Sequence, residues 1–218
     1  MGSDLMLLAV VNVSTLILPA DLTRAVAACA FQIEHHLGPA WGVSARVEVF
    51  PDLDCLPEGA FPVLVADDEA QLGALGDHDP TQAMIGVNDA NLMGVPWSCV
   101  LSHELCETVV NPRLDAFRLN SETGVEWALE VSDPVENQRY AYSGVALSDF
   151  VLPAFFDVRS RGVPLNWRKT LSAPFSLEPP NGHAITRAPG GSPESLPSAP
   201  MLAWKRTARS RTRQLLAG

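Results

Sequence analysis

The run Val100–Val110 is the feature that most constrains how this chain can fold and act. It is rich in apolar residues and contains neither glycine nor proline, so it predicts a helix. Within it, His103 and Glu107 are four residues apart and project from the same face. An imidazole nitrogen and a carboxylate oxygen in this arrangement can hold one divalent metal ion. The opposite face carries the residues expected to anchor the helix in a core, namely Leu101, Leu105 and Val109.

Glu104 lies on the same predicted helix, about a quarter turn from His103. From there it could take a proton from a metal-bound water. Taken alone, the pattern His-Glu-x-x-Glu is short, and it also occurs by chance on solvated surface helices. Cys106 is either a small buried residue or a contributor to the metal-binding face.

A second acidic cluster follows a stretch of alternating side chains. Val125–Val131 alternates apolar and polar residues, which predicts a strand or an extended segment. This segment leads to three acidic residues, Glu130, Asp133 and Glu136. On a surface they would form only an acidic turn. If the fold brings them to His103, their charges repel one another unless a cation is present, so convergence would indicate a metal site.

The order of the predicted elements is that of an α/β (α+β) fold. A buried strand over Leu5–Leu18 is followed by a helix that is capped by Asp21 and ended by Gly38-Pro39. A polar loop is expected over Gly73–Pro80, and it contains His78. Three further strands are predicted before the His103 helix, over Val43–Val49, Phe61–Ala66 and Ala83–Val87.

Composition divides the chain into one domain, an arm and a tail. With 218 residues, of which 47% are hydrophobic, the chain can bury one core, which we expect over residues 1–170. Residues 171–203 are rich in proline, glycine and serine, and they predict a linker or an extended Pro-rich C-terminal arm. Residues 204–218 are basic, and they are either a docking segment for a protein partner or a solvated terminus.

Charge and hydropathy exclude several classes of protein. No run reaches the roughly 18 apolar residues of a membrane span, and no basic residue precedes Leu5–Leu18 as in a signal peptide. We therefore expect no membrane association and a cytoplasmic location, with a virion as the alternative. The net charge of −10 argues against nucleic acid as a ligand, except through the basic tail. The four cysteines show no Cys-x-x-Cys spacing and predict reduced thiols.

Several segments together carry a resemblance to known proteins. The helix pattern resembles the His-Glu-x-x-His helix of zincin metallopeptidases, with Glu107 in place of the second histidine. It also resembles a group of mostly uncharacterised zincin-like bacterial and viral proteins, which show Ser-His-Glu-x-x-Glu, then Asp-Pro, then Glu-x-x-Asp. This chain has Asn111 where that group has aspartate before the proline. The matching segments are Gly73–Asp79, Ser102–Pro112, Glu130–Glu136 and Ser148–Asp157.

The resemblance implies a fold and a set of metal ligands. The fold would be zincin-like, a twisted mixed sheet packed on an active-site helix. His103 and Glu107 would bind Zn²⁺, or another divalent metal such as manganese or iron. Glu130 would be the third ligand, with Asp133 orienting His103 through its second ring nitrogen. The reverse assignment of these two acids is also open.

The resemblance further implies a hydrolytic activity. Glu104 would be the general base, and His78 would contact the substrate or its oxyanion. The protein would then be a zinc metallohydrolase, a peptidase or amidase with a peptide or protein substrate. The alternative is a non-catalytic structural or interaction protein on a zincin-like fold, such as a component of a virion or another assembly.

Overall fold

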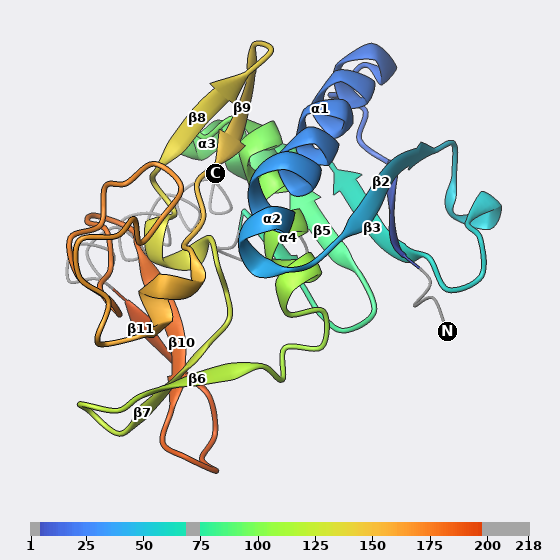
Figure 1. Cartoon of the computed structure of the whole chain (residues 1–218). Helices are drawn as coiled ribbons and strands as arrows, with labels where there is room; N and C mark the ends of the chain where they lie inside the picture. The colour runs from blue at the N-terminus through green and yellow to red at the C-terminus, as the bar shows by residue number, and fades with distance from the viewer. Residues whose placement is uncertain (1–4, 69–74, 198–218) are drawn as a thin grey trace, which may run out of the picture.

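The N-terminal half of the chain forms a five-stranded mixed sheet in the computed structural model, which describes residues 5–68 and 75–197 (Figure 1). The sheet order is β2-β1-β3-β5-β4, in which β4 alone runs antiparallel to its neighbour and lies at an edge. Residues 8–11 of β1 are all buried, so both faces of the sheet are covered at its centre. The strands are β1 (Met6–Asn12), β2 (Ala45–Phe50), β3 (Phe61–Ala66), β4 (Gly76–His78) and β5 (Ala83–Gly86).

Two long helices pack against this sheet and against each other. The predicted His103 helix is confirmed as α4 (Trp97–Val110), and it contacts β4, β5 and α1. Its apolar face is buried as expected, because Leu101, Leu105 and Val109 belong to the core. The other helices are α1 (Pro19–Gln32), α2 (Gly38–Trp41) and α3 (Val87–Met93).

The C-terminal half adds a four-stranded antiparallel sheet of order β11-β10-β7-β6 and a β8-β9 hairpin. In Figure 1, α4 is seen between the two larger sheets. The protein is therefore a mixed α+β structure. These strands are β6 (Phe117–Asn120), β7 (Val125–Ala128), β8 (Arg139–Tyr142), β9 (Val145–Ser148), β10 (His183–Arg187) and β11 (Glu194–Pro197). The 3₁₀ turns are η2 (Leu53–Cys55), η3 (Asp133–Val135) and η4 (Pro153–Phe156).

The predicted strand over Leu5–Leu18 was too long, since β1 ends at Asn12. The side chain of Asn12 closes a turn there, because its Nδ2 donates to the Ile17 carbonyl at 3.0 Å. Its Oδ1 also accepts the backbone N–H of Ser14 at 3.1 Å. The prediction that Asp21 caps the following helix was wrong. The helix begins at Pro19 with Leu18 as its N-cap, so Asp21 lies in its first turn.

The prediction that Gly38-Pro39 ends the first helix was also wrong. A π-helical turn, η1 (Ile33–Leu37), follows α1, and the Gly38 N–H donates to the Ile33 carbonyl five residues back. This wider turn carries the chain past a proline, which would clash with a carbonyl in a regular α-helix. The helix instead ends at Gly42, which has a left-handed φ of 68°.

The range 171–203, expected to be a linker or arm, contributes two strands within the described residues. Thr186 of β10 lies opposite Trp127 of β7, and Ala184 is buried. The expected loop over Gly73–Pro80 likewise contains β4. The basic tail at 204–218 lies outside the described residues. In the part of the chain that the structure describes, no helix has the length and hydrophobicity needed to cross a membrane.

The anchoring of α4 can be tested by truncating a fully buried leucine. Leu105 is 0% exposed, so we expect Leu105→Ala to lower the free energy of unfolding by about 2–5 kcal/mol through lost contacts and a cavity. Leu92→Ala is the matched control, because Leu92 is 69% exposed and its truncation should cost less than about 0.5 kcal/mol. Urea denaturation followed by circular dichroism measures both. Equal losses in the two variants would contradict this packing.

Candidate metal centre

The position of α4 is fixed by a buried polar connection as well as by its apolar face. Ser102 Oγ donates to Gln32 Oε1 of α1 at 2.7 Å, and it accepts the backbone N–H of Ser148 at 2.9 Å. All three residues are buried. Buried hydrogen bonds of this kind are costly to break, so α4 has little freedom to rotate. The helix therefore holds His103, Glu104 and Glu107 toward one cleft.

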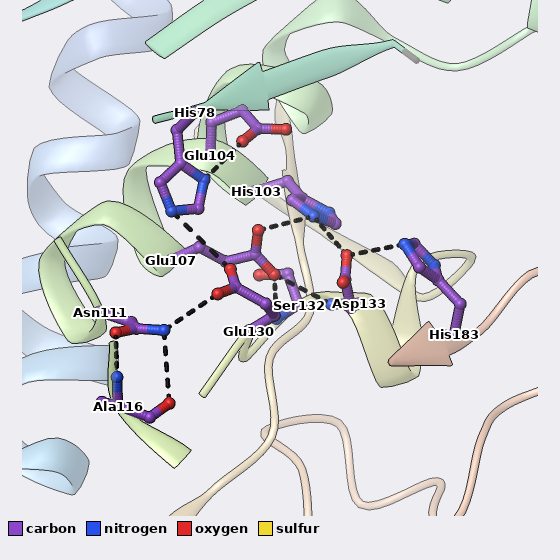
Figure 2. Close-up of polar contacts among 10 residues, drawn as sticks. All are labelled: His78, His103, Glu104, Glu107, Asn111, Ala116, Glu130, Ser132, Asp133 and His183. Carbon is purple, nitrogen blue, oxygen red and sulfur yellow. Dashed lines mark hydrogen bonds and ion pairs between the residues drawn. The ribbon is translucent and has the colours of Figure 1, made fainter. Parts of the chain in front are cut away.

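Glu107 connects α4 to the segment that follows β7. Its Oε1 accepts the backbone N–H groups of Ser132 at 3.0 Å and Asp133 at 3.1 Å (Figure 2). Two donors on one oxygen orient the carboxylate, and they leave Oε2 free to face the cleft. This Oε2 lies 3.2 Å from Nε2 of His103, as the four-residue spacing predicted.

The first candidate ligand group consists of His103, Glu107 and Asp133. Asp133 Oδ1 lies 3.2 Å from His103 Nε2, the same nitrogen that faces Glu107. One ligand atom from each of the three residues lies within 4.8 Å of the others. A single N–H hydrogen points well at only one of the two carboxylate oxygens, whereas a cation among the three atoms would contact all of them.

This geometry bears on the two open assignments of the third ligand. Glu130 was preferred, but the structure groups Asp133 with His103 and Glu107. Asp133 was expected to orient His103 through the second ring nitrogen, yet it faces Nε2, as Glu107 does. The reason is that η3 turns back over α4, and it brings Asp133 rather than the preceding extended residues to the ring.

The second candidate group lies on the other side of Glu107. His78 on β4 places Nδ1 3.2 Å from Glu104 Oε2, and His78, Glu104 and Glu107 also offer three ligand atoms within 4.8 Å of one another. His78 Nε2 is 3.8 Å from Glu130 Oε2, and it has no hydrogen-bond partner in the described part of the chain. All four residues are buried. His78 therefore contacts the predicted base, Glu104.

Glu130 is held by Asn111 at the end of α4. Asn111 Nδ2 donates to Glu130 Oε1 at 3.0 Å, while Asn111 Oδ1 accepts the backbone N–H of Ala116 at 3.0 Å. Both side chains are buried. These two hydrogen bonds explain why asparagine suits this position. An aspartate here would lack the donor and would repel Glu130.

A third histidine, His183, was not identified from the sequence. Its Nε2 lies 3.2 Å from Asp133 Oδ1 (Figure 2). Its Nδ1 lies 3.2 Å from Glu136 Oε2. It begins β10, within the range expected to be a linker. The sequence does contain a short strand-like run, His183–Arg187, between Gly182 and Pro189. The prolines and glycines around it led to the prediction of a linker instead.

The predicted residues share one cleft with a volume of about 450 Å³. Its polar lining includes all six predicted site residues, namely His78, His103, Glu104, Glu107, Glu130 and Asp133. Its apolar lining includes Leu75, Val95, Phe117 and Ile185. The cleft thus combines ligand atoms with apolar surface, as small-molecule and peptide sites do.

The backbone of β4 packs directly on the side chain of Glu104. A Cβ atom built on Gly76 would lie 2.7 Å from Glu104 Oε1 and 2.8 Å from Val100 Cγ1. Such distances are far below van der Waals contact, so only glycine fits without displacing a buried side chain. Gly76 and His78 of β4 therefore both confine the Glu104 carboxylate.

Burial and charge shift the pKa values of the histidines. Burial disfavours each imidazolium ion, but nearby carboxylates outweigh it. The hydrogen bond to Glu104 and the charge of Glu107 raise the pKa of His78 to about 9. Asp133 and Glu136 do the same for His183, whose pKa also rises to about 9. The charge of Glu107 and the hydrogen bond to Asp133 raise the pKa of His103 well above its usual value.

The carboxyl groups respond unequally to the same environment. Burial raises the pKa of Glu104 and, more strongly, that of Glu130, whose neighbour Glu107 adds repulsion. Burial acts on Asp133 as well, but the charges of His183 and His103 outweigh it and lower the pKa of Asp133. The metal-free cleft therefore holds protons that a cation would displace.

Comparisons with protein-family models, curated proteins and solved structures found no match. The chemistry of the cleft therefore rests on its own residues. His103, Glu107 and Asp133 offer one imidazole and two carboxylates, a set of ligands that Zn²⁺ accepts. The two carboxylate oxygens also suit Mn²⁺ or Fe²⁺. The cleft has buried groups that can hold a metal ion, and they do not by themselves distinguish among these metals.

The raised histidine pKa values predict a pH dependence for the metal-free protein. Between pH 6.5 and about 9, His78 and His183 hold protons in the folded state that the unfolded chain has released. The free energy of unfolding in excess EDTA should therefore decrease as the pH rises through this range. Urea denaturation at several pH values measures it. His183→Gln should make the decrease shallower, and a stability that increases with pH over this range would contradict the assignment.

Proposed function

We propose that this protein is a divalent-metal-dependent hydrolase of peptide or amide bonds, with a site of zincin type. The observation that supports it most is the placement of Glu107 Oε2 and Asp133 Oδ1, each 3.2 Å from His103 Nε2. These three residues would hold the metal. Zinc, when bound, supplies Lewis acidity, which polarises a carbonyl group and lowers the pKa of water toward about 7.

The protein's own residues would carry the proton transfers. Glu104 is buried beside the first ligand group, and burial raises its pKa, as suits a group that both accepts and returns a proton. It would take a proton from water as the water oxygen bonds to the carbonyl carbon. It would then give that proton to the leaving nitrogen as the C–N bond breaks. His78, 3.2 Å from Glu104 Oε2, would orient this carboxylate.

A peptide substrate is supported by the shape of the cleft. β4 lies at the edge of its sheet among the described strands, and Gly76 and His78 both line the cleft. An edge strand offers unpaired backbone N–H and C=O groups to an extended peptide. Apolar lining residues such as Val95 and Ile185 would receive substrate side chains.

A structural metal is the second candidate, and His183 favours it. Its Nε2 is 3.2 Å from Asp133 Oδ1, so a small movement would bring it to the same cation as a fourth protein ligand. Zinc sites with four protein ligands are closed and structural, whereas catalytic sites keep a position open. The protein would then be an interaction or assembly component without hydrolytic activity.

Glu104→Gln distinguishes the two candidates. We expect the purified full chain to retain about one equivalent of zinc after dialysis and to cleave members of a peptide library. Glu104→Gln should keep the zinc and lose about 10²–10⁴-fold in kcat/KM, because it removes the proton acceptor. Glu58→Gln is the matched control, because Glu58 is exposed and should leave both measurements unchanged. Elemental analysis and mass spectrometry of the products provide the measurements.

One outcome would contradict the proposed hydrolase, and another would contradict the role of Glu104. Zinc bound without cleavage of any peptide would favour the structural metal. Equal cleavage by Glu104→Gln and the parent would exclude Glu104 as the base.

A further inference from the structure

The second ligand group has the properties of a cation site in its own right. His78, Glu104 and Glu107 come from β4 and α4, and their ligand atoms lie within 4.8 Å of one another. They are 7%, 5% and 3% exposed, respectively. The group shares only Glu107 with the group formed by His103 and Asp133. The cleft therefore contains two sets of three donors with one carboxylate in common.

An unpartnered nitrogen points independently to a ligand. His78 Nε2 is buried and has no hydrogen-bond partner among the described residues. It faces Glu130 Oε2 across 3.8 Å, which is too long for a hydrogen bond (Figure 2). A buried polar atom without a partner is costly, so its presence requires an explanation such as a bound ion.

The charge of the cleft gives a second reason. Four carboxylates lie together, all buried: Glu104, Glu107, Glu130 and Asp133. One divalent cation in the His103 group would balance two of these negative charges. Among the others, Glu104 and Glu130 face the ring of His78, which offsets part of their charge when it carries a proton. A second divalent cation among His78, Glu104 and Glu107 would replace that proton and bring more positive charge to the same carboxylates.

We propose that a second divalent cation binds among His78, Glu104 and Glu107, and that it inhibits the hydrolase when it binds. One imidazole and two carboxylates suit Zn²⁺ or Mn²⁺. Because the two sites share Glu107, two cations in the cleft repel each other, so the second binds more weakly than the first.

Inhibition follows from the identity of the ligands, and this part rests on the proposed function. Glu104 is the proton acceptor of the hydrolase and also a donor of the second group. A carboxylate that binds a cation is a weaker base, and it is turned away from the attacking water. The protein should therefore be active with one cation and lose activity as the second site fills.

Zinc titration of the metal-free full chain tests the second site directly. Isothermal titration calorimetry with zinc chloride should give two equivalents for the parent. His78→Gln should lose the weaker equivalent, and His103→Gln should lose the tighter one. Glu107→Gln should weaken both, since it belongs to both groups. His35→Gln is the matched control, because His35 is exposed and should leave two equivalents.

If a variant fails to fold, the number of zinc equivalents bound by the parent protein still tests the second site. A single equivalent in the parent would overturn the proposal, and so would two equivalents in folded His78→Gln. Two equivalents without hydrolysis would retain the second site and refute the proposed function. Hydrolysis that stays constant from one equivalent of zinc to a large excess would retain the function and refute the inhibition.

Discussion

The structure of the cleft depends on one buried carboxylate, that of Glu107. One of its oxygens accepts two backbone N–H groups from residues 132 and 133, and the other faces His103. This interaction joins α4, which is fixed to the first sheet, to η3, which leads into the C-terminal half. Without it, two buried N–H groups would lose their acceptor, and Asp133 would have no fixed position beside His103. The same side chain thus orders the backbone and completes the site.

The cleft concentrates negative charge where a protein interior ordinarily avoids it. Without a metal, the three histidines offset part of this charge, and burial raises the pKa values of Glu104 and Glu130. This arrangement costs free energy, because burial disfavours the charged forms of all these groups. Binding of a cation would release the histidine protons and replace several ion pairs with direct ligand contacts. A functional site explains such a cluster better than a stabilising role in the core does.

The sequence predicted the features that depend on local pattern. The helix at 100–110 was found as α4, and the four-residue spacing brought His103 and Glu107 together. The placement of Asp133 rather than Glu130 beside His103 depends on how η3 turns over α4, which no local pattern encodes. His183 was missed because its position comes from pairing between β10 and β7, about sixty residues apart in the chain. The predicted helix end at Gly38-Pro39 was wrong because a π-helical turn accommodates Pro39 and the helix continues.

The proposed binding of a divalent cation by His103, Glu107 and Asp133 can be tested in crystals of the full chain grown with zinc chloride. Diffraction data collected on both sides of the zinc absorption edge should show an anomalous peak about 2.0–2.2 Å from His103 Nε2, Glu107 Oε2 and Asp133 Oδ1. An ordered cleft with no anomalous peak among these three atoms would contradict it.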